Sequence, residues 1–537
     1  MLKKDKKSRF IRIFWILFYF LIFCLLVRGG FSYLDPDFGW HLKVGQEISL
    51  SGQVPSVNLY NDTYTGNWVD HEWLSNLALY NFYNFAGYEA IVVVFALLIL
   101  VVLILLNWFF SKHTKYKLPL GINAAWQLLA VLAAMPHFGV RLQELALLFT
   151  LLVLIILNDY ERRKRKLTLL FLPPLFFLWA NLHASFLIGL FLLAAFIAIK
   201  ISERLLFRLS TRYKFWSFID FSKLMERRDV WYLFLGWLSA FSVTMLTPYK
   251  LNLYSFLIGY KNKAYLRLIQ EWLPQYAFPF HYDQLICLAL GAAALLFYIY
   301  YRLKEHQGLE IWPVFLTVLF LFLSFQSRRH FPLFFIASFG FMMEAYGRLF
   351  IDTPIIKDVY YKWIKHLIFI CLALVIIFEI SEIKPVSNPF NAFCNNYPCA
   401  AIDFLDNNPQ YLNSHLFNSY GWGGFLIHEL PSKKIFIDGR LPQVEFAGKT
   451  FIQEYYSFFD TDSSPEIKLK EYNIGAVLIK IKDKPVKAKR WEKVVFMIKD
   501  EDLITVNRLK DYLDEASDWK VVYEDEVSRI YVRTFSF

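Results

Sequence analysis

The chain has 537 residues, of which 57% are hydrophobic and 19% aromatic, and its mean hydropathy is +0.37. A soluble core of this size needs far less apolar surface, so the composition excludes an ordinary soluble protein and predicts one that lies in a bilayer. The net charge of +11 does not indicate a nucleic-acid partner, because the Lys and Arg residues stand in short clusters between apolar segments, as topology signals do.

The N-terminal segment has the features of a membrane anchor. Residues 1–9 are basic, and residues 10–27 are apolar apart from Arg12. The apolar run is long and no small-residue cleavage site follows it, which favours a retained helix with a cytoplasmic N-terminus over a signal peptide. Residues 31–88 are then expected to form an outer loop.

Ten further apolar segments each approach the roughly 20 residues that a bilayer requires. Together with the first, they predict eleven spans: 10–27, 89–110, 119–137, 142–158, 168–181, 185–201, 230–247, 284–301, 311–326, 331–347 and 362–380. The basic clusters fall on alternate connections, at 112–117, 162–166, 204–228, 302–304 and 348–365, which indicates that these face the cytoplasm. An odd number of spans places residues 381–537 outside. This topology depends on a break at residues 181–185, because one long helix there would invert everything that follows.

The C-terminal part has a different composition. Residues 381–398 include a Pro/Asn-rich linker, and residues 399–537 alternate short helical and strand patterns, which predicts a small extracytoplasmic α/β domain. The expected helices are 400–407, 451–459 and 465–471, and the expected strands are 415–418, 425–429, 434–437, 476–481, 519–523 and 528–533. Cys394 and Cys399 could form a disulfide in an oxidising compartment. The predicted fold class is therefore a polytopic α-helical membrane domain, residues 1–380, followed by this domain.

The outer loop carries two acidic clusters, and the first surrounds a predicted helix start. Asp35 precedes Pro36 and is expected to be the N-cap, with Asp37 in the first turn and Gly52 near the end of the helix. His41 lies one turn beyond Asp37 on the same face, so the two could share a proton, a metal ion or a phosphate. Helix capping is the alternative role for Asp35, and interaction with the helix dipole is the alternative for Asp37.

The second cluster lies at residues 70–72. Asp70 again resembles an N-cap, and His71 and Glu72 open a helix whose apolar positions suggest that it lies along the membrane surface. Mg²⁺ or Mn²⁺ could bind through Asp37 and Glu72, because hard oxygen ligands suit these ions.

Several basic side chains lie at the outer ends of the predicted spans, where the positive-inside rule predicts few. They are His137, Arg141, His183, Arg328, Arg329 and His330. An anionic lipid headgroup or a phosphate leaving group would give them a partner, since Arg binds phosphate in a bidentate manner. The alternative is that Arg328 and Arg329 extend to membrane headgroups. We expect the acids and these bases to meet in one pocket on the outer face.

These features resemble the first outer loop of GT-C glycosyltransferases, a superfamily that includes protein O-mannosyltransferases, lipid A aminoarabinose transferases and oligosaccharyltransferase catalytic subunits. In the aminoarabinose transferase pattern an Asp opens this helix and a Gly closes it at the distance that separates Asp37 from Gly52. The chain is also similar to bacterial glycosyltransferase-like membrane proteins in a set of motifs: Asp35-Pro36-Asp37-x-x-Trp40-His41, Trp68-x-x-His71-Glu72-Trp73, Trp179-Ala180-Asn181-x-His183, Tyr420-Gly421-Trp422-Gly423-Gly424 and Asp438-Gly439-Arg440.

The resemblance implies that Asp37 is the catalytic base and Glu72 the second acidic position, with Asp35, His41, Asp70, His71, Arg141, His183, Arg328, Arg329 and His330 binding the substrates. The sequence departs from the family in three places. Phe-Gly-Trp-His follows Asp37 where Glu is usual, the Lys-Pro after the second acid is absent, and the oligosaccharyltransferase WWD signature is missing, which argues against that branch. In the tail, Asp438-Gly439-Arg440 and the Gly421–Gly424 segment could be ordinary turns or could bind the acceptor.

The function that these observations favour is transfer of a sugar from a polyprenyl-phosphate donor, with inversion, to a glycan, lipid or protein acceptor at the outer face of a bacterial inner membrane. No nucleotide-binding motif is present, which mildly favours a lipid-linked donor. The alternatives are a lipid or polysaccharide transporter and a non-enzymatic envelope assembly protein. A transporter should carry charges within its spans, whereas here they gather at the ends.

Overall fold

A computed structural model describes residues 2–210, 218–258, 263–350, 358–446, 448–460, 464–481, 487–499 and 507–534. The chain divides into two compact units. The helical unit contains residues 1–33, 90–250 and 271–385, and the loop-and-tail unit contains residues 34–89, 251–270 and 386–537. The first outer loop thus belongs to the same compact unit as the C-terminal tail. Parts of two predicted basic connections, residues 211–217 and 351–357, lie outside the described residues.

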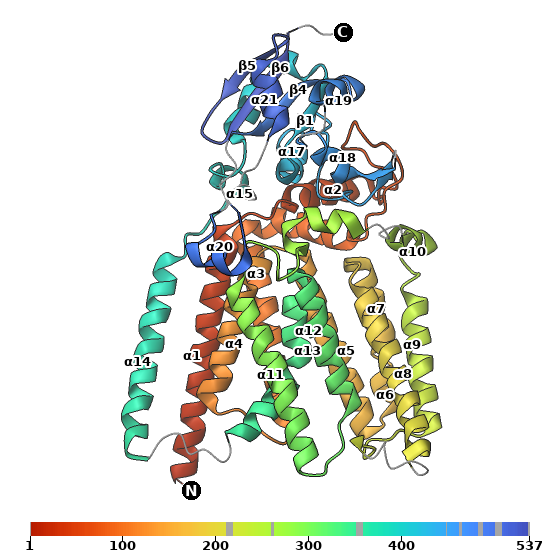
Figure 1. Ribbon diagram of the computed structural model, residues 1–537, viewed down its shortest axis with the longest axis vertical. Coiled ribbons are helices and arrows are strands. Elements are labelled where there is room, and N and C mark those ends of the chain that lie inside the picture. Colours follow the sequence, from red (N-terminus) through yellow and green to blue (C-terminus); the bar gives the residue numbers. More distant parts are fainter. Residues whose placement is uncertain are drawn as a thin grey trace. The chain divides into compact units, whose positions relative to one another are not determined.

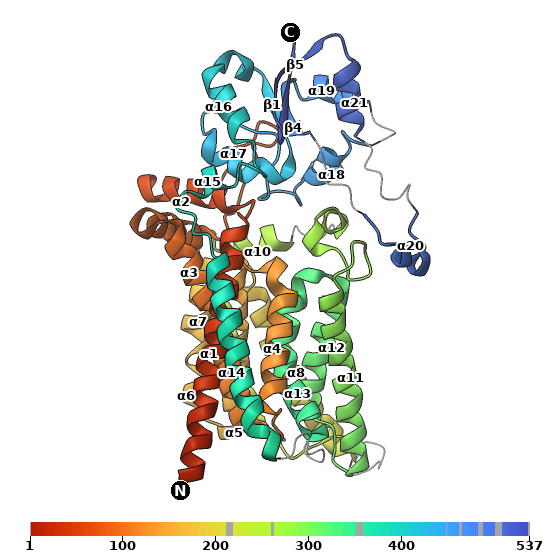
Figure 2. The ribbon, with the colours of Figure 1, turned by 90° about the vertical axis from the view of Figure 1, so that its left-hand side faces the viewer.

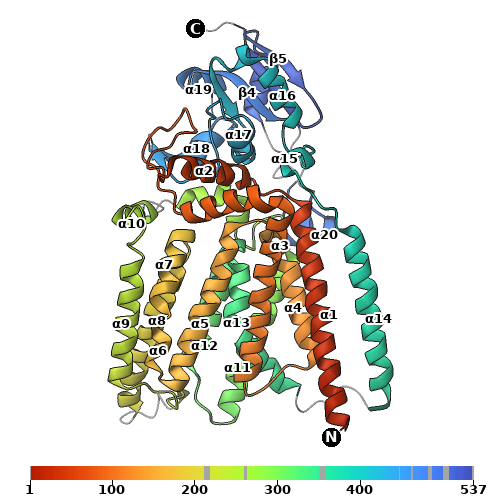
Figure 3. The same cartoon turned by 180° about the vertical axis from the view of Figure 1, so that it is seen from behind.

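The helical unit is a bundle of long, roughly parallel apolar helices (Figures 1 and 3). Its helices are α1 (Leu2–Ser32), the later part of α3 (Trp73–His113), α4 (Leu120–Ala134), α5 (Leu145–Arg163), α6 (Lys166–Leu169), α7 (Leu172–Leu182), α8 (Phe186–Ser210), α9 (Arg227–Val243), α11 (Tyr282–Lys304), α12 (Ile311–Gln326), α13 (Phe331–Leu349) and α14 (Asp358–Glu382). Short 3₁₀ turns join them at η1 (Met135–His137), η2 (Leu142–Glu144), η5 (Gln270–Trp272) and η6 (Arg328–His330).

A helix lies over each of the eleven predicted spans, including the separate α7 and α8. By length and composition, however, only six helices of the described chain are long and apolar enough to cross a membrane, and two further apolar helices are shorter. The protein is therefore a multi-pass membrane protein, but the predicted number of eleven spans is not confirmed. Pro173 and Pro174 begin α7 rather than interrupt a span, because proline suits the first turn of a helix.

Two sets of charges inside the bundle are paired. Arg28 of α1 lies 3.0 Å from Glu379 of α14, and the Glu379 side chain is buried. Lys200 of α8 is buried between Glu161 (2.5 Å) and Glu203 (2.9 Å). Pairing is required because an isolated charge in a low-dielectric interior is costly.

The loop-and-tail unit begins with α2 (Phe38–Ser51) and the first turns of α3, and adds α10 (Leu251–Ile258) and η4 (Lys263–Leu268). Gly52 ends α2 in the left-handed conformation, as predicted. Its tail contains α15 (Pro389–Ala392), α16 (Cys399–Asn407), η7 (Pro409–Leu412), η8 (Tyr420–Trp422), α17 (Gly423–Glu429), α18 (Phe451–Tyr456), α19 (Pro465–Glu471), α20 (Arg490–Phe496) and α21 (Arg508–Glu515).

A mixed four-stranded sheet forms the core of the tail. Its strand order is β1 (His415–Asn418), β4 (Ile474–Lys480), β6 (Ser528–Arg533) and β5 (Trp519–Glu524), and only the β1–β4 pair is parallel. Helix α16 covers one face of the sheet, and α19 and α21 lie on the other (Figure 2). A second, two-stranded sheet pairs β2 (Glu445–Phe446) with β3 (Lys449–Thr450). Cys394 and Cys399 are joined by a disulfide, as the sequence allowed.

Two predicted strands are wrong. Residues 425–429 belong to helix α17, and residues 434–437 form only isolated bridges through Ile435. The reason for the first error is a close helix contact. Gly424 of α17 lies so near the start of α2 that an added Cβ would clash with the Pro36 carbonyl oxygen, and a Cβ on Gly39 of α2 would clash with the Gly424 backbone. Glycines at positions 39 and 424 therefore allow the backbones of α2 and α17 to lie in contact. A strand at residues 425–429 would not make this helix–helix contact.

This contact makes a stability prediction. Gly424→Ala should lower the free energy of unfolding by about 1–3 kcal/mol, because the obstructing atom belongs to the backbone and cannot rotate away. Gly421→Ala is the matched control, since nothing lies within 4 Å of its added Cβ. The measurement is the thermal unfolding midpoint of the two variants in the same detergent. Equal midpoints would show that the α2–α17 contact is looser than described.

Candidate active site

Asp37 lies at the N-terminus of α2, where its carboxylate is oriented by neighbours. The helix begins at Phe38, so the N-cap position belongs to Asp37 and not, as predicted, to Asp35. Asp35 instead accepts a hydrogen bond from the Asp37 backbone N–H (2.9 Å), the local turn that Asp side chains favour. The Asp37 carboxylate makes no capping bond to the helix, and its Oδ1 accepts the indole N–H of Trp40 at 2.9 Å.

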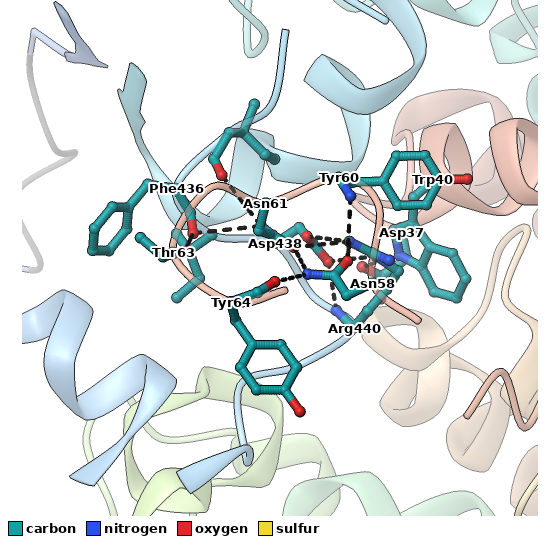
Figure 4. A network of polar contacts seen from close by, with 12 residues as sticks. Asp37, Trp40, Asn58, Tyr60, Asn61, Thr63, Tyr64, Phe436, Asp438 and Arg440 are labelled. Atoms are coloured by element: carbon teal, nitrogen blue, oxygen red, sulfur yellow. Dashed lines mark hydrogen bonds and ion pairs between the residues drawn. The ribbon is translucent and has the colours of Figure 1, made fainter. Parts of the chain in front are cut away.

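The Asp438-Gly439-Arg440 turn of the tail lies directly against Asp37. A Cβ on Gly439 would clash with the Asp37 carboxylate, so only glycine allows this approach. Asp438 and Arg440 form a buried ion pair, in which Arg440 Nη2 is 2.8 Å from Asp438 Oδ2 and Nε is 2.8 Å from Oδ1. This pair is part of the network drawn in Figure 4.

The first outer loop encloses the Arg440 side chain. Arg440 Nη2 donates to the side-chain oxygens of Asn58 (3.1 Å) and Asn61 (3.0 Å) (Figure 4). Its guanidinium also lies over the rings of Tyr60 and Trp68, at 4.5 and 4.7 Å from their centroids. Asp438 and Arg440 are thus neutralised and buried, which supports a positioning role for this turn.

Asp70 in the second acidic cluster is buried and tightly bonded. Asn76 Nδ2 lies 3.0 and 2.8 Å from its two carboxylate oxygens, and the Glu72 backbone N–H donates to Oδ1 at 3.1 Å. Burial raises the pKa of Asp70 to about 7, although these hydrogen bonds oppose the shift. Helix α3 begins at Trp73, so Asp70 stabilises the preceding turn and is not the predicted N-cap.

Asn76 connects Asp70 to His41, and Glu72 lies near both His41 and His71. His41 Nδ1 lies 2.6 Å from Asn76 Oδ1 and 3.9 Å from Glu72 Oε2, and His71 Nε2 lies 3.8 Å from Glu72 Oε1. The predicted residues His41, Asp70, His71 and Glu72 therefore do come together. The Glu72 carboxylate thus lies near two imidazoles, at distances longer than a hydrogen bond.

The helical unit has a separate cluster at the turns that join α4 to α5 and α12 to α13. Glu271 is held by two guanidiniums, with Arg141 Nη1 at 2.9 Å and Arg329 Nη1 at 2.6 Å. Burial alone would raise the pKa of Glu271, but the charges of Arg329 and Arg141 outweigh it and lower the pKa below its ordinary value. The Arg329 guanidinium also lies 4.8 Å from the centroid of the Trp272 ring, which His330 contacts from another side.

Two other predicted basic residues have different surroundings. Arg328 is only 1% exposed, and its Nη2 donates to the carbonyls of Ala277 and Pro279. It therefore does not extend to headgroups. Its Nε and Nη1 have no hydrogen-bond partner among the described residues. His183 ends α7, with Nδ1 2.8 Å from Ser185 Oγ.

Sequence reasoning missed Glu271, Asn76 and Gly439 as members of these clusters. Glu271 stands beside Trp272 in a loop that has no recognisable motif. Its acidic side chain, on the same side as the basic residues at the outer span ends, could nevertheless have indicated that it pairs with them. Asn76 carries no signal, because an amide in an amphipathic helix is ordinary. In the part of the chain that the structure describes, no group of three His, Cys, Asp or Glu side chains is arranged to hold a metal ion.

The raised pKa of Asp70 predicts that the free energy of unfolding depends on pH. The native state keeps a proton that the unfolded chain releases near pH 4, so the stability that protonated Asp70 contributes is complete below pH 4 and is lost as the pH rises toward 7. Between these values the free energy of unfolding should fall by on the order of 4 kcal/mol, and Asp70→Asn should remove this fall. Unfolding midpoints from pH 4 to 8 test it, with exposed Asp403→Asn as the control. Parallel pH curves for wild type and Asp70→Asn would contradict the assignment.

Comparison with known proteins gives a match at the level of structure. No protein-family model matches the chain, and no curated protein sequence matches it. Among solved structures, oligosaccharyltransferase AglB from Archaeoglobus fulgidus, in complex with an inhibitory peptide and a dolichol-phosphate, is similar with a TM-score of 0.52 and 11% identity over 97% of this chain and 80% of that chain. A second structure of the A. fulgidus enzyme, tethered to an acceptor peptide, has a TM-score of 0.49 and 12% identity over 87% of this chain and 69% of that chain.

At this identity the likeness concerns the fold, and it spans nearly the whole chain. The sequence lacks the WWD signature of oligosaccharyltransferases, so the fold is shared without that motif. The resemblance noted from the acidic loop is therefore confirmed at the level of fold, which the chain shares with AglB.

Proposed function

We propose that the protein is an inverting glycosyltransferase that moves a sugar from a polyprenyl-phosphate carrier to an acceptor at the outer face of the membrane. The observation that carries this proposal is the Asp37 carboxylate at the start of α2, fixed by Trp40 and Gly439 within a GT-C fold. The hydrogen bond from the Trp40 indole N–H fixes the orientation of this carboxylate, and an ionised carboxylate can act only as an acceptor.

Asp37 is the proposed general base. It takes the proton from an acceptor hydroxyl, the acceptor oxygen bonds to the anomeric carbon, and the bond from that carbon to the phosphate oxygen breaks. Attack from the side opposite the phosphate inverts the anomeric centre. Glu72, between His41 and His71, is the second acidic residue of the same compact unit and the proposed partner in proton handling.

Arg141 and Arg329 are the proposed phosphate-binding residues of the helical unit. Both guanidiniums contact one carboxylate, that of Glu271, and this shared contact supports a site for an oxyanion. A departing phosphate carries more negative charge than a carboxylate, so the pair would stabilise charge that develops during transfer. That these arginines and the acids share one pocket stays a prediction from the sequence.

The donor class and compartment follow from further observations. The similar AglB structure contains a dolichol-phosphate and an inhibitory peptide, which supports a lipid-linked donor and includes peptides among the acceptor classes here. The disulfide of Cys394 and Cys399 supports an oxidising compartment for the tail. The bacterial inner membrane is our proposed location, with the N-terminus in the cytoplasm. A transporter is not favoured, because the fold is that of a transferase superfamily.

Asp37→Asn should lower the turnover rate roughly 10²- to 10⁴-fold, the usual contribution of a general base, with little change in donor KM. The assay is transfer from a short-chain polyprenyl-phosphate sugar by purified full-length protein. Asp403→Asn, an exposed carboxylate of the same compact unit, is the matched control and should leave the rate unchanged. Undiminished transfer by folded Asp37→Asn would remove Asp37 from its role, and no transfer by the wild type with any carrier would favour an assembly protein.

A divalent ion through Asp37 and Glu72 is the second part of the proposal. Mg²⁺ usually keeps several waters and uses one or two carboxylates, so a site of two acids suits it. We expect EDTA to abolish transfer and added Mg²⁺ or Mn²⁺ to restore it, and Glu72→Gln to raise the metal concentration that gives half-maximal rate. Full activity in EDTA would show that the reaction needs no such ion.

A further inference from the structure

A cavity of about 290 Å³ lies in the helical unit, far from the Glu271 cluster. It is formed where α3, α5, α11 and α13 end and where α12 begins. Helix α5 separates the two features, because Arg141 precedes it and Arg162 stands at its other end. Its 19 residues make it about 28 Å long, so the cavity and the arginine cluster belong to opposite ends of the bundle.

The end that holds the cavity has the character of a cytoplasmic surface. The last turns of the helices there are basic, with Lys112 and His113 in α3, Arg162 and Arg163 in α5, Arg302 and Lys304 in α11, and Arg348 in α13. This is the charge distribution of the positive-inside rule. The cavity thus opens near the inner leaflet, if the topology is as proposed above.

The cavity wall is partly apolar and aromatic. Phe110, Trp312 and Phe341 contribute to it. The Phe110 ring can lie against α13 only because residue 340 is glycine, since a Cβ there would clash with the ring. An aromatic wall of this kind suits a ligand with an apolar part better than it suits water alone.

Most charged groups of the wall already have partners of opposite sign. Arg302 pairs with Asp220 at 2.6 Å, and Lys223 pairs with Glu310 at 2.5 Å. Arg348 pairs with Glu305, and Glu161 with Lys200. These pairs contribute no net charge that would attract a ligand.

Three charged side chains of the wall are different. Arg162 donates to the His113 carbonyl at 2.9 Å, and Lys115 lies 5.1 Å from the centroid of the Tyr116 ring. Glu344 of α13 completes the group. Within the described ranges, none of Arg162, Lys115 and Glu344 forms an ion pair. Two cations and one carboxylate therefore line one cavity outside the ion pairs described above.

We propose that this cavity binds the zwitterionic headgroup of a membrane phospholipid, with its phosphate on Arg162 and Lys115 and its ammonium group on Glu344. Two cations suit a phosphate, and a carboxylate beside them disfavours a purely anionic headgroup unless an ammonium group neutralises it. The volume is near the lower limit for small-molecule sites, so it suits a headgroup and not a whole lipid. The aromatic wall would contact the glycerol and the first methylenes.

The test uses the full-length protein in nanodiscs with equal amounts of phosphatidylethanolamine and phosphatidylglycerol, followed by native mass spectrometry of the retained lipids. The wild type should retain phosphatidylethanolamine preferentially. The Lys115→Gln/Arg162→Gln double variant should lose about tenfold of this retention, as expected when charge-assisted hydrogen bonds to a phosphate are removed. Glu344→Gln should shift the preference toward phosphatidylglycerol. Arg163→Gln is the control, because Arg163 is not part of the cavity wall and pairs with Asp159 at 3.0 Å.

Equal retention of the two lipids by the wild type would overturn the proposal. This result needs no variant, so the test remains decisive even if a variant folds poorly. Unchanged retention by the folded double variant would also overturn it. Soluble glycerophosphoethanolamine distinguishes a free phosphate from a lipid: if it displaces the retained lipid at equal concentration, the site recognises a soluble phosphate and the lipid assignment fails.

Discussion

The loop-and-tail unit depends on the buried ion pair between Asp438 and Arg440. Burying two charges costs several kcal/mol per ion unless each finds further partners, and a buried pair alone is poor evidence of stability. Here the cost is met by Asn58, Asn61 and two aromatic rings, all from the first outer loop. The loop is needed to complete the tail, and the tail is needed to order the loop. Asp37 is fixed where the two meet, through the glycine between the paired residues.

This arrangement explains why an apparently simple tail is attached to a membrane-spanning helical unit. Segments more than 370 positions apart form one compact unit, as the Asn61–Arg440 hydrogen bond illustrates. A carboxylate that acts as a base must be held in one geometry, because small displacements are costly to a reaction that depends on alignment. The turn that holds Asp37 belongs to the tail, so the C-terminal part of the chain serves the proposed chemistry without contributing a reactive group.

The Glu271 cluster shows a different way to organise charge. Two arginines at the ends of separate helices would repel each other, and the carboxylate between them removes that repulsion. Arg328 beside them has only carbonyl partners among the residues described, a weaker neutralisation in a buried position. This part of the helical unit thus holds two guanidiniums that share one carboxylate and a third that is bonded only to carbonyl oxygens among the residues described.

Helix positions could be predicted because apolar runs of bilayer length have few other structures available to them. The strands β1, β4, β5 and β6 could also be predicted, since each has the composition of a half-buried strand. Residues 425–429 could not, because their helix depends on the contact of Gly424 with Pro36, nearly 390 positions earlier in the chain. For the site, Asp70, His71 and Glu72 could be grouped in advance since they are adjacent in sequence, whereas the contact of His41 with Asn76 joins segments 35 positions apart. The contact of Gly439 with Asp37 is a property of the tertiary fold, and no local pattern predicts it.

The Arg28–Glu379 pair bears on how the protein is made. Arg28 belongs to α1 and Glu379 to α14, so the arginine is synthesised well before the carboxylate that pairs with it. A guanidinium within a newly inserted helix is unfavourable in hydrocarbon until its carboxylate arrives. Until α14 is inserted, Arg28 must therefore contact other groups, such as lipid phosphates or the insertion machinery. The native Arg28–Glu379 pair forms only after α14 is in place.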